Sequence, residues 1–111
     1  MTNVERLQAH FEEQAEPARL AAIASELARL ATWVRSRRPD ESVSSMLREI
    51  AWLMEWTGDA ASVELANMQR ELCRWRRAWP VESARPVLEL RARQMAERVA
   101  SMSGLTGRDE S

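Results

Sequence analysis

Two side chains in this sequence, His10 and Cys73, could supply a general base or a nucleophile. His10 is the only histidine, so the sequence holds no histidine-based metal cluster and no histidine dyad. Cys73 lies between Leu72 and Arg74 with no histidine near it in sequence. We therefore expect Cys73 to be an inert, partly buried thiol and His10 to be an ordinary half-exposed side chain.

The carboxylates do not form a recognisable catalytic or metal-binding pattern either. Glu12, Glu13 and Glu16 make the start of the chain acidic, but they lack the Glu-x-x-His partners that a di-iron bundle uses. No glycine-rich phosphate loop, zinc-ligand spacing or nucleophile elbow is present. The sequence therefore predicts a protein that is not an enzyme and that needs no cofactor and no metal.

Arginine is the basic residue that this chain uses, since lysine is absent. The net charge of −1 gives no bulk attraction to nucleic acid or membranes. Arginines nevertheless gather at the ends of two predicted helices, and Arg70 and Arg74 form a like-charge pair on one helix face. The candidate anion-docking residues are Arg35, Arg37, Arg38, Arg70, Arg74 and Arg77.

Two interpretations of these arginines stay open. Cations are favoured at helix C-termini, where the last carbonyls leave partial negative charge, and nearby carboxylates can neutralise part of the cluster. Alternatively, one end of the molecule docks an acidic protein segment, RNA or DNA through planar, bidentate guanidinium contacts.

The elements that carry these residues are predicted to be helices. Hydrophobic residues make up 45% of the 111 residues, but there are only 3 glycines and 4 prolines, which disfavours many short strands. We expect an all-α fold, a small antiparallel up-and-down bundle of four to five helices. One domain should span residues 1–104, followed by a flexible tail at 105–111.

Caps and prolines indicate where the helices begin and end. Thr2 or Asn3 can cap the first helix, and Pro17 begins a second or bends one long helix. Pro39 ends the second helix, and Asp40 or Ser42 caps a third that runs to Thr57. The remaining signals are Gly58 and Asp59 before a fourth helix from about 60 to 79, Ser83 and Pro86 opening a fifth, and Gly104 closing it.

Helical spacing separates the tryptophans into two groups. Each residue advances about 100° around a helix, which places Trp75 and Trp79 on the core-facing stripe of the fourth helix. Trp52 and Trp56 instead lie well away from the apolar face of the third helix, on the side of Ser45 and Glu49. Trp33 also lies off the core-facing stripe of its own helix. We expect these outward tryptophans to need a cover.

The cover is either the first helix, with its apolar stripe of Val4, Leu7 and Phe11, or a second protein surface. The favoured hypothesis is a non-enzymatic interaction protein (adaptor, regulator or assembly factor) that forms a homodimer. Its interface candidates are Trp52, Trp56, Glu49, Ser45 and Trp33. The alternative is a small helical subunit of a ribonucleoprotein assembly that uses the arginines.

The start of the sequence is charged, and no apolar run is long enough to span a bilayer. We therefore expect a cytoplasmic protein without a signal peptide or membrane partner.

Overall fold

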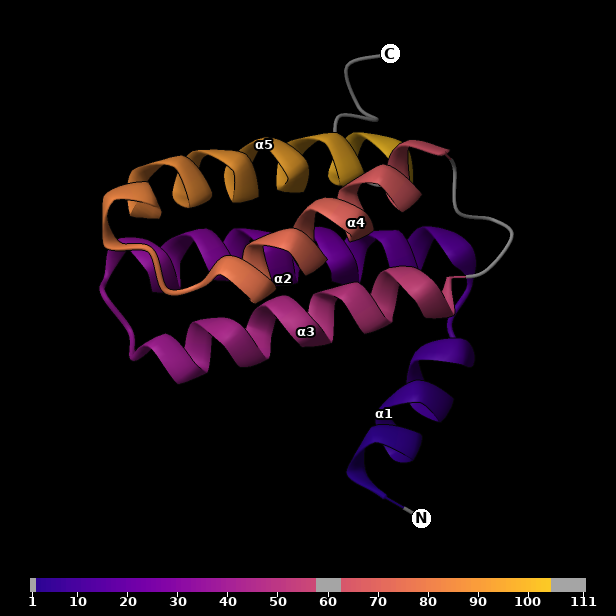
Figure 1. The fold of residues 1–111 in the computed structure, drawn as a ribbon. Coiled ribbons are helices and arrows are strands. Elements are labelled where there is room, and N and C mark those ends of the chain that lie inside the picture. Colours follow the sequence, from indigo (N-terminus) through magenta and orange to yellow (C-terminus); the bar gives the residue numbers. More distant parts are fainter. Residues whose placement is uncertain (1, 58–62, 105–111) are drawn as a thin grey trace.

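The computed structural model describes residues 2–57 and 63–104, and these residues form an all-α bundle (Figure 1). The helices are α1 (Asn3–Glu12), α2 (Glu16–Arg35), α3 (Asp40–Trp56), α4 (Val63–Ala78) and α5 (Arg85–Ser103). A short 3₁₀ helix, η2 (Glu82–Ala84), precedes α5. The predicted tail at 105–111 lies outside the described residues.

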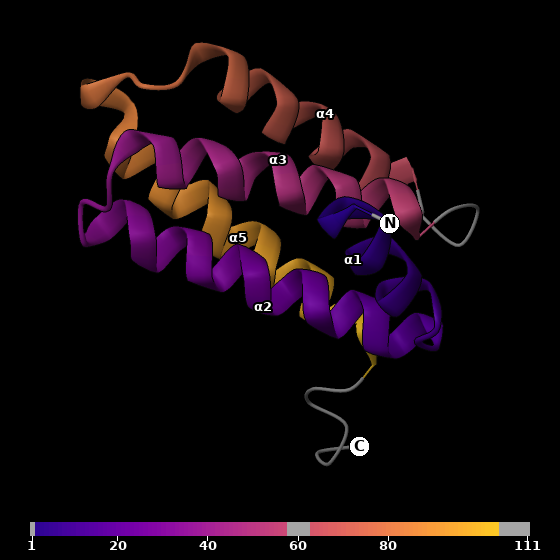
Figure 2. The ribbon, with the colours of Figure 1, turned by 90° about the horizontal axis from the view of Figure 1, so that it is seen from below.

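Helices α2 to α5 alternate in direction, so the predicted antiparallel up-and-down bundle is confirmed (Figure 1). Around the bundle, α2 lies between α5 and α3, and α4 packs on α3. The backbones of α2 and α5 approach each other most closely (Figure 2). Helix α1 stands apart from this layer arrangement, because it projects from the α2–α3 side of the bundle (Figure 1).

The core consists of the apolar stripes that the three-four spacing predicts. On α2 the buried stripe is Leu20, Ile23, Leu27, Leu30 and Val34, and on α5 it is Leu88, Ala92, Met95 and Val99. Helix α3 adds the broad apolar face that the sequence indicates, which includes Val43, Leu47 and Ile50. These residues form one continuous cluster, so the four long helices share a single core.

Small residues explain the close approach of α2 and α5. Ala24 and Ala31 on α2 and Ala92 and Ala96 on α5 are all buried. Side chains this short let two helix backbones come together while larger neighbours fill the space above and below them. The two backbones therefore lie close together, and a hollow of about 340 Å³ remains between them, lined by small residues that include Ala24, Ala28 and Ala96.

Charged side chains tie α4 to α5 across a wider separation. Arg91 donates from Nε to Glu71 Oε2 at 2.8 Å and from Nη2 to Glu71 Oε1 at 2.7 Å. Arg98 donates from Nε to Glu64 Oε2 at 2.6 Å. The hydrogen bonds from Arg91 hold the pKa of the Glu71 carboxyl below its usual value. Arg98 lowers the pKa of Glu64 in the same way.

The predicted helix starts are confirmed in part. Thr2 caps α1 in a capping box, since its side chain accepts from the Glu5 N–H at 3.1 Å and Glu5 accepts from the Thr2 N–H at 2.8 Å. Pro17 lies in the first turn of α2, so it begins a new helix rather than bending a long one. The predicted cap of α3 is wrong: Pro39 occupies the N-cap position, and no side-chain cap forms.

The other predicted boundaries vary in outcome. Gly58, Asp59 and the predicted start of the fourth helix at 60 lie outside the described residues. Gly104 does adopt the left-handed conformation that ends a helix, with φ of 72°.

Helix α2 ends earlier than the position of Pro39 suggests. Arg37 adopts a left-handed backbone with φ of 60°, and the Arg38 N–H donates to the Trp33 carbonyl at 3.0 Å. This is the hydrogen bond of a helix end that usually carries glycine. An arginine in this conformation gave no sequence signal, because the conformation is unfavourable for a residue with a Cβ atom.

The two tryptophans of the fourth helix differ in burial. Trp79 is buried just beyond the end of α4, as the spacing predicts, with the Arg85 guanidinium 5.1 Å from its ring centroid. Trp75 is only half-buried, and its indole N–H donates to Glu71 Oε2 at 3.3 Å. Trp75 therefore lies at the edge of the core, although helical spacing places it on the core-facing stripe.

Candidate protein-interaction face

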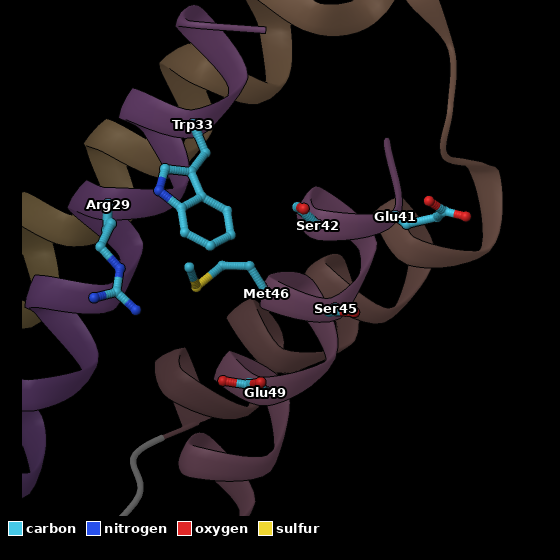
Figure 3. Close-up of a pocket in the computed structure, with 7 residues that line it drawn as sticks. All are labelled: Arg29, Trp33, Glu41, Ser42, Ser45, Met46 and Glu49. Atoms are coloured by element: carbon cyan, nitrogen blue, oxygen red, sulfur yellow. The ribbon is translucent and has the colours of Figure 1, made fainter. Parts of the chain in front are cut away.

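A groove runs between α2 and α3 on the side of the bundle opposite α5. One half of it, here called the open half, has a volume of about 340 Å³. Its lining residues are Arg29, Trp33, Glu41, Ser42, Ser45, Met46 and Glu49. Figure 3 shows the Trp33 indole pointing across the groove toward Met46, with Glu49 farther along α3. Apolar and polar side chains thus meet in one accessible hollow.

The same groove continues toward α1. Its second half, here called the closed half, has a volume of about 280 Å³. Leu7, His10, Phe11 and Gln14 of the α1 region line it together with Ala22, Glu26, Arg29, Glu49 and Leu53. Because Arg29 and Glu49 line both halves, the two hollows are consecutive parts of one groove. Helix α1 closes one end of it and leaves the other end open.

An aromatic stack forms where α1 meets α3. The rings of Trp52 and Trp56 are stacked, with centroids 6.0 Å apart, and Phe11 lies against Trp56 at 6.3 Å. The Arg48 guanidinium lies 5.0 Å from the Trp52 ring centroid on the same helix. Phe11 is buried, but Trp52 and Trp56 remain half-exposed. The first helix, which is one of the two predicted covers, therefore covers this pair of tryptophans only in part.

Trp33 has a different set of neighbours at the open half. The guanidinium of Arg29 lies 5.6 Å from the Trp33 ring centroid, and that of Arg38 lies 5.1 Å from it. Cations over an indole ring stabilise its orientation while leaving its edge accessible. Trp33 is thus held as a half-buried wall of the groove.

The structure brings three of the five predicted interface residues into the open half: Trp33, Ser45 and Glu49. Trp52 and Trp56 lie farther along α3, beside α1. We call these five residues together the tryptophan face. Among the described residues, Glu49 forms no salt bridge, so its carboxylate is available to a cation.

Sequence reasoning did not assign Arg29, Arg48 or Met46 to this surface, although it did name Leu7 as part of the covering stripe of the first helix. The arginines could have been found, because Arg29 and Arg48 each precede a tryptophan by four positions, the spacing at which side chains on a helix touch. Met46 was assigned to the core and is buried, yet it forms the floor of the open half. No pattern in the sequence distinguishes a core methionine from one at the base of a groove.

The predicted arginine cluster is assembled only in part. The C-terminal ends of α2 and α4 lie at the same end of the bundle as the start of α5 (Figure 1). Arg37 forms an ion pair with Glu82. Arg85 is buried, and its Nη1 lies 3.9 Å from Oδ1 of Asp40. A hollow of about 220 Å³ is lined by Val34, Arg35, Arg37, Glu82, Arg85, Pro86 and Glu89. Carboxylates thus accompany the arginines around this hollow.

The remaining candidates for anion docking are exposed but dispersed. Arg38 lies over the Trp33 ring, and Arg70 donates to the Asn67 side chain at 2.8 Å. Arg74 and Arg77 are exposed on α4 and form no salt bridge among the described residues. The predicted docking residues therefore do not converge on one hollow.

His10 and Cys73 lie on different helices, and His10 lines the closed half of the groove with Glu26 and Glu49. His10 is exposed on α1, and Cys73 is a half-buried free thiol on α4. Across residues 2–57 and 63–104, no group of three or more histidine, cysteine, aspartate or glutamate side chains could hold a metal ion.

Comparisons with protein-family models, curated proteins and solved structures find no match to this chain. Within the described part of the chain, every helix is too short or too polar to cross a bilayer.

Proposed function

We propose that this chain is a non-enzymatic protein-interaction protein, an adaptor, regulator or assembly factor, that works in the cytoplasm as a helical homodimer through the tryptophan face. The observation that carries this proposal is the groove between α2 and α3, with half-buried Trp33 in its wall and the half-buried Trp52–Trp56 stack farther along α3. Tryptophan is enriched among the residues that dominate binding energy, because it combines a large apolar ring with a polar N–H group.

The charges along this face favour a second copy of the chain as the partner. Arg29 and Arg48 lie over Trp33 and Trp52, and Glu49 lines the groove with Arg29 and forms no salt bridge among the described residues. In a two-fold dimer the same surface contributes to both sides, so a face that carries both signs can pair with itself. A surface of a single sign would repel its own copy.

The absence of convergent chemistry among the described residues supports a non-enzymatic role. His10 and Cys73 lie on different helices and share no hollow. His10 lines the closed half of the groove with Glu26 and Glu49, but Cys73 lines neither half.

The alternative function, a subunit of a nucleic-acid-binding assembly, rests on the exposed arginines. It has weaker support, because Arg37 and Arg85 already face carboxylates and Arg38 lies on Trp33. Filter binding to single-stranded RNA and duplex DNA tests it, since several phosphate contacts give strong salt dependence. Binding at low salt that weakens steeply with added salt would favour the alternative.

The experiment for the homodimer is mass determination in solution by sedimentation equilibrium. We expect the wild-type chain to have twice its monomer mass at micromolar concentration. The variant with Ser45→Arg and Glu49→Arg should be a folded monomer, because two added cations face Arg29 and Arg48 across the interface.

A matched control carries the same two changes on the outside of the bundle. Glu97→Arg and Ser101→Arg replace the same residue types at the same spacing on exposed positions of α5. This control should keep the dimer mass. A wild-type monomer at 100 micromolar, or a dimer that survives the α3 changes, contradicts the proposal.

A further inference from the structure

Helix α1 is docked on the bundle only at its base. Along its apolar stripe, Phe11 is 3% exposed, but Leu7 and Val4 are 37% and 38% exposed. At a rise of about 1.5 Å per residue, Leu7 lies about 6 Å and Val4 about 10 Å beyond Phe11 along the helix axis. Two apolar side chains therefore extend past the surface that buries the third.

The connection between α1 and α2 fixes the direction of this arm. Arg19 donates from Nε to the Gln14 carbonyl at 2.8 Å and from Nη2 to the Glu12 carbonyl at 3.0 Å. These bonds satisfy carbonyls at the end of α1 that the helix itself leaves free. The arm consequently projects at a set angle from the α2–α3 side (Figure 1).

The open half of the groove matches the exposed end of the arm. Leu7 and Phe11 line the closed half, so the apolar stripe of α1 already lies beside the surface between α2 and α3. The open half continues this surface and offers Trp33 and Met46 as apolar walls.

The charges agree with this match. Helical spacing places Glu5 and Glu12 more than about 100° away from the apolar stripe of α1. His10 flanks the stripe instead, and it already lines the closed half together with Glu49. The stripe can therefore approach the side of α3 that carries Glu41 and Glu49 without bringing carboxylates together.

We propose that α1 is an exchanged arm: Val4 and Leu7 of one copy insert into the open half of the groove of the second copy, and the second copy does the same in return. This inference rests on the proposed homodimer and specifies its geometry. Arg29 and Glu49 are common to both halves of the groove. A two-fold axis that passes near these two residues places the closed half of one copy opposite the open half of the other.

The first test compares two apolar pairs of equal spacing. Val4→Asp with Leu7→Asp should weaken the dimer on the order of 100-fold or more, because carboxylates would enter an apolar site. The control is Val87→Asp with Leu90→Asp on α5, where the wild-type side chains are 51% and 48% exposed. This control should keep the wild-type dissociation constant, and circular dichroism should show both variants fully helical.

The second test traps the arm in its partner with a disulfide. In a Cys73→Ser background, Leu7→Cys with Ser42→Cys should give a covalent dimer on a non-reducing gel. Within one chain Phe11 packs on Trp56, and Trp56 lies about 21 Å along α3 from Ser42. A band at twice the monomer mass that disappears on reduction can come only from a bond between two chains.

The outcomes separate this inference from the proposed function. A covalent dimer from the double cysteine variant, and not from either single variant, supports arm exchange. A noncovalent dimer that forms no such disulfide, or that survives the aspartates on α1, overturns arm exchange and leaves the homodimer standing. A wild-type monomer overturns both.

Discussion

Helix α2 has two neighbours, and it meets them in opposite ways. Toward α5 it presents buried alanines, and the two backbones approach closely with the core packed around them. Toward α3 it presents Arg29 and Trp33, and a groove remains between the helices. A hollow of about 340 Å³ lies on each side, so the two interfaces differ in what lines them. We call the alanine-rich interface toward α5 the closed interface, because its backbones lie close together, and the one toward α3, with its aromatic and charged side chains, the open interface.

The difference teaches where association can occur on a small bundle. The closed interface presents mainly alanine and serine in its hollow, so it offers a partner no aromatic ring. An open interface keeps half-buried aromatic rings and charged groups at a surface, where a second protein can cover them. Two predictions test this contrast and two test the contacts that hold the bundle around it, from the largest expected effect to the smallest.

The largest effect should come from the closed side. Leu88→Ala on α5 removes a fully buried side chain and should lower the free energy of unfolding by about 2–5 kcal/mol. Leu90→Ala on the same helix is the control, because that side chain is exposed, and it should cost at most about 0.5 kcal/mol. Urea denaturation measures the free energy of unfolding of both variants. Equal losses for the two variants would contradict the prediction.

Adding volume should distinguish the two sides of α2. Ala92→Leu places a larger side chain into the closed interface, where Ala92 is fully buried, and should cost about 1–3 kcal/mol. Ser45→Leu adds a similar volume in the open half of the groove and should change stability by at most about 0.5 kcal/mol. If thermal denaturation shows Ser45→Leu to be the more damaging change, the groove is not open.

The charged link between α4 and α5 should depend on pH. The pKa of Glu71 is lowered in the folded state. Its contribution to the free energy of unfolding is therefore present above pH 4.5 and is lost as the pH falls below that value. Because the pair is partly exposed, Glu71→Gln should cost at most about 1 kcal/mol at pH 7 and nothing near pH 2. Glu64→Gln, in the more exposed pair, should have a smaller effect in the same urea titrations.

The turn between α2 and α3 should give the smallest effect. Arg37→Gly removes the strain of a left-handed backbone at a residue with a Cβ atom, which costs about 1–2 kcal/mol. Two effects oppose this gain: glycine adds conformational freedom to the unfolded chain, and the ion pair with Glu82 is lost. We expect a net gain of about 0.5 kcal/mol in unfolding free energy and an unchanged dimer mass. A loss of stability would mean that the ion pair with Glu82 outweighs the backbone strain.

The sequence predicted the helices and the core well because both depend on local periodicity. The buried stripes of α2 and α5 follow the three-four spacing, and Thr2 and Gly104 mark helix ends by their preferred conformations. The cap of α3 was wrong because Asp40 and Ser42 compete with a proline that already fixes the entry of the chain.

The candidate site could be predicted only to the level of a helix face. Spacing on α3 places Ser45, Glu49, Trp52 and Trp56 on one side, and the structure agrees with that grouping. Spacing on one helix cannot tell how far α2 lies from α3, and that distance creates the groove. It also cannot show that α1 reaches Trp56 through Phe11 alone, because the direction of α1 depends on the Arg19 contacts.

The pairing of α2 with α5 also determines when this chain can fold during synthesis. The closed interface joins the first long helix to the last one, so α2 cannot complete its packing while α5 is still inside the ribosome. A nascent chain that ends after α4 therefore exposes the alanine and leucine stripe of α2. We expect chaperone contacts with this stripe until α5 emerges, after which the bundle closes in one cooperative step.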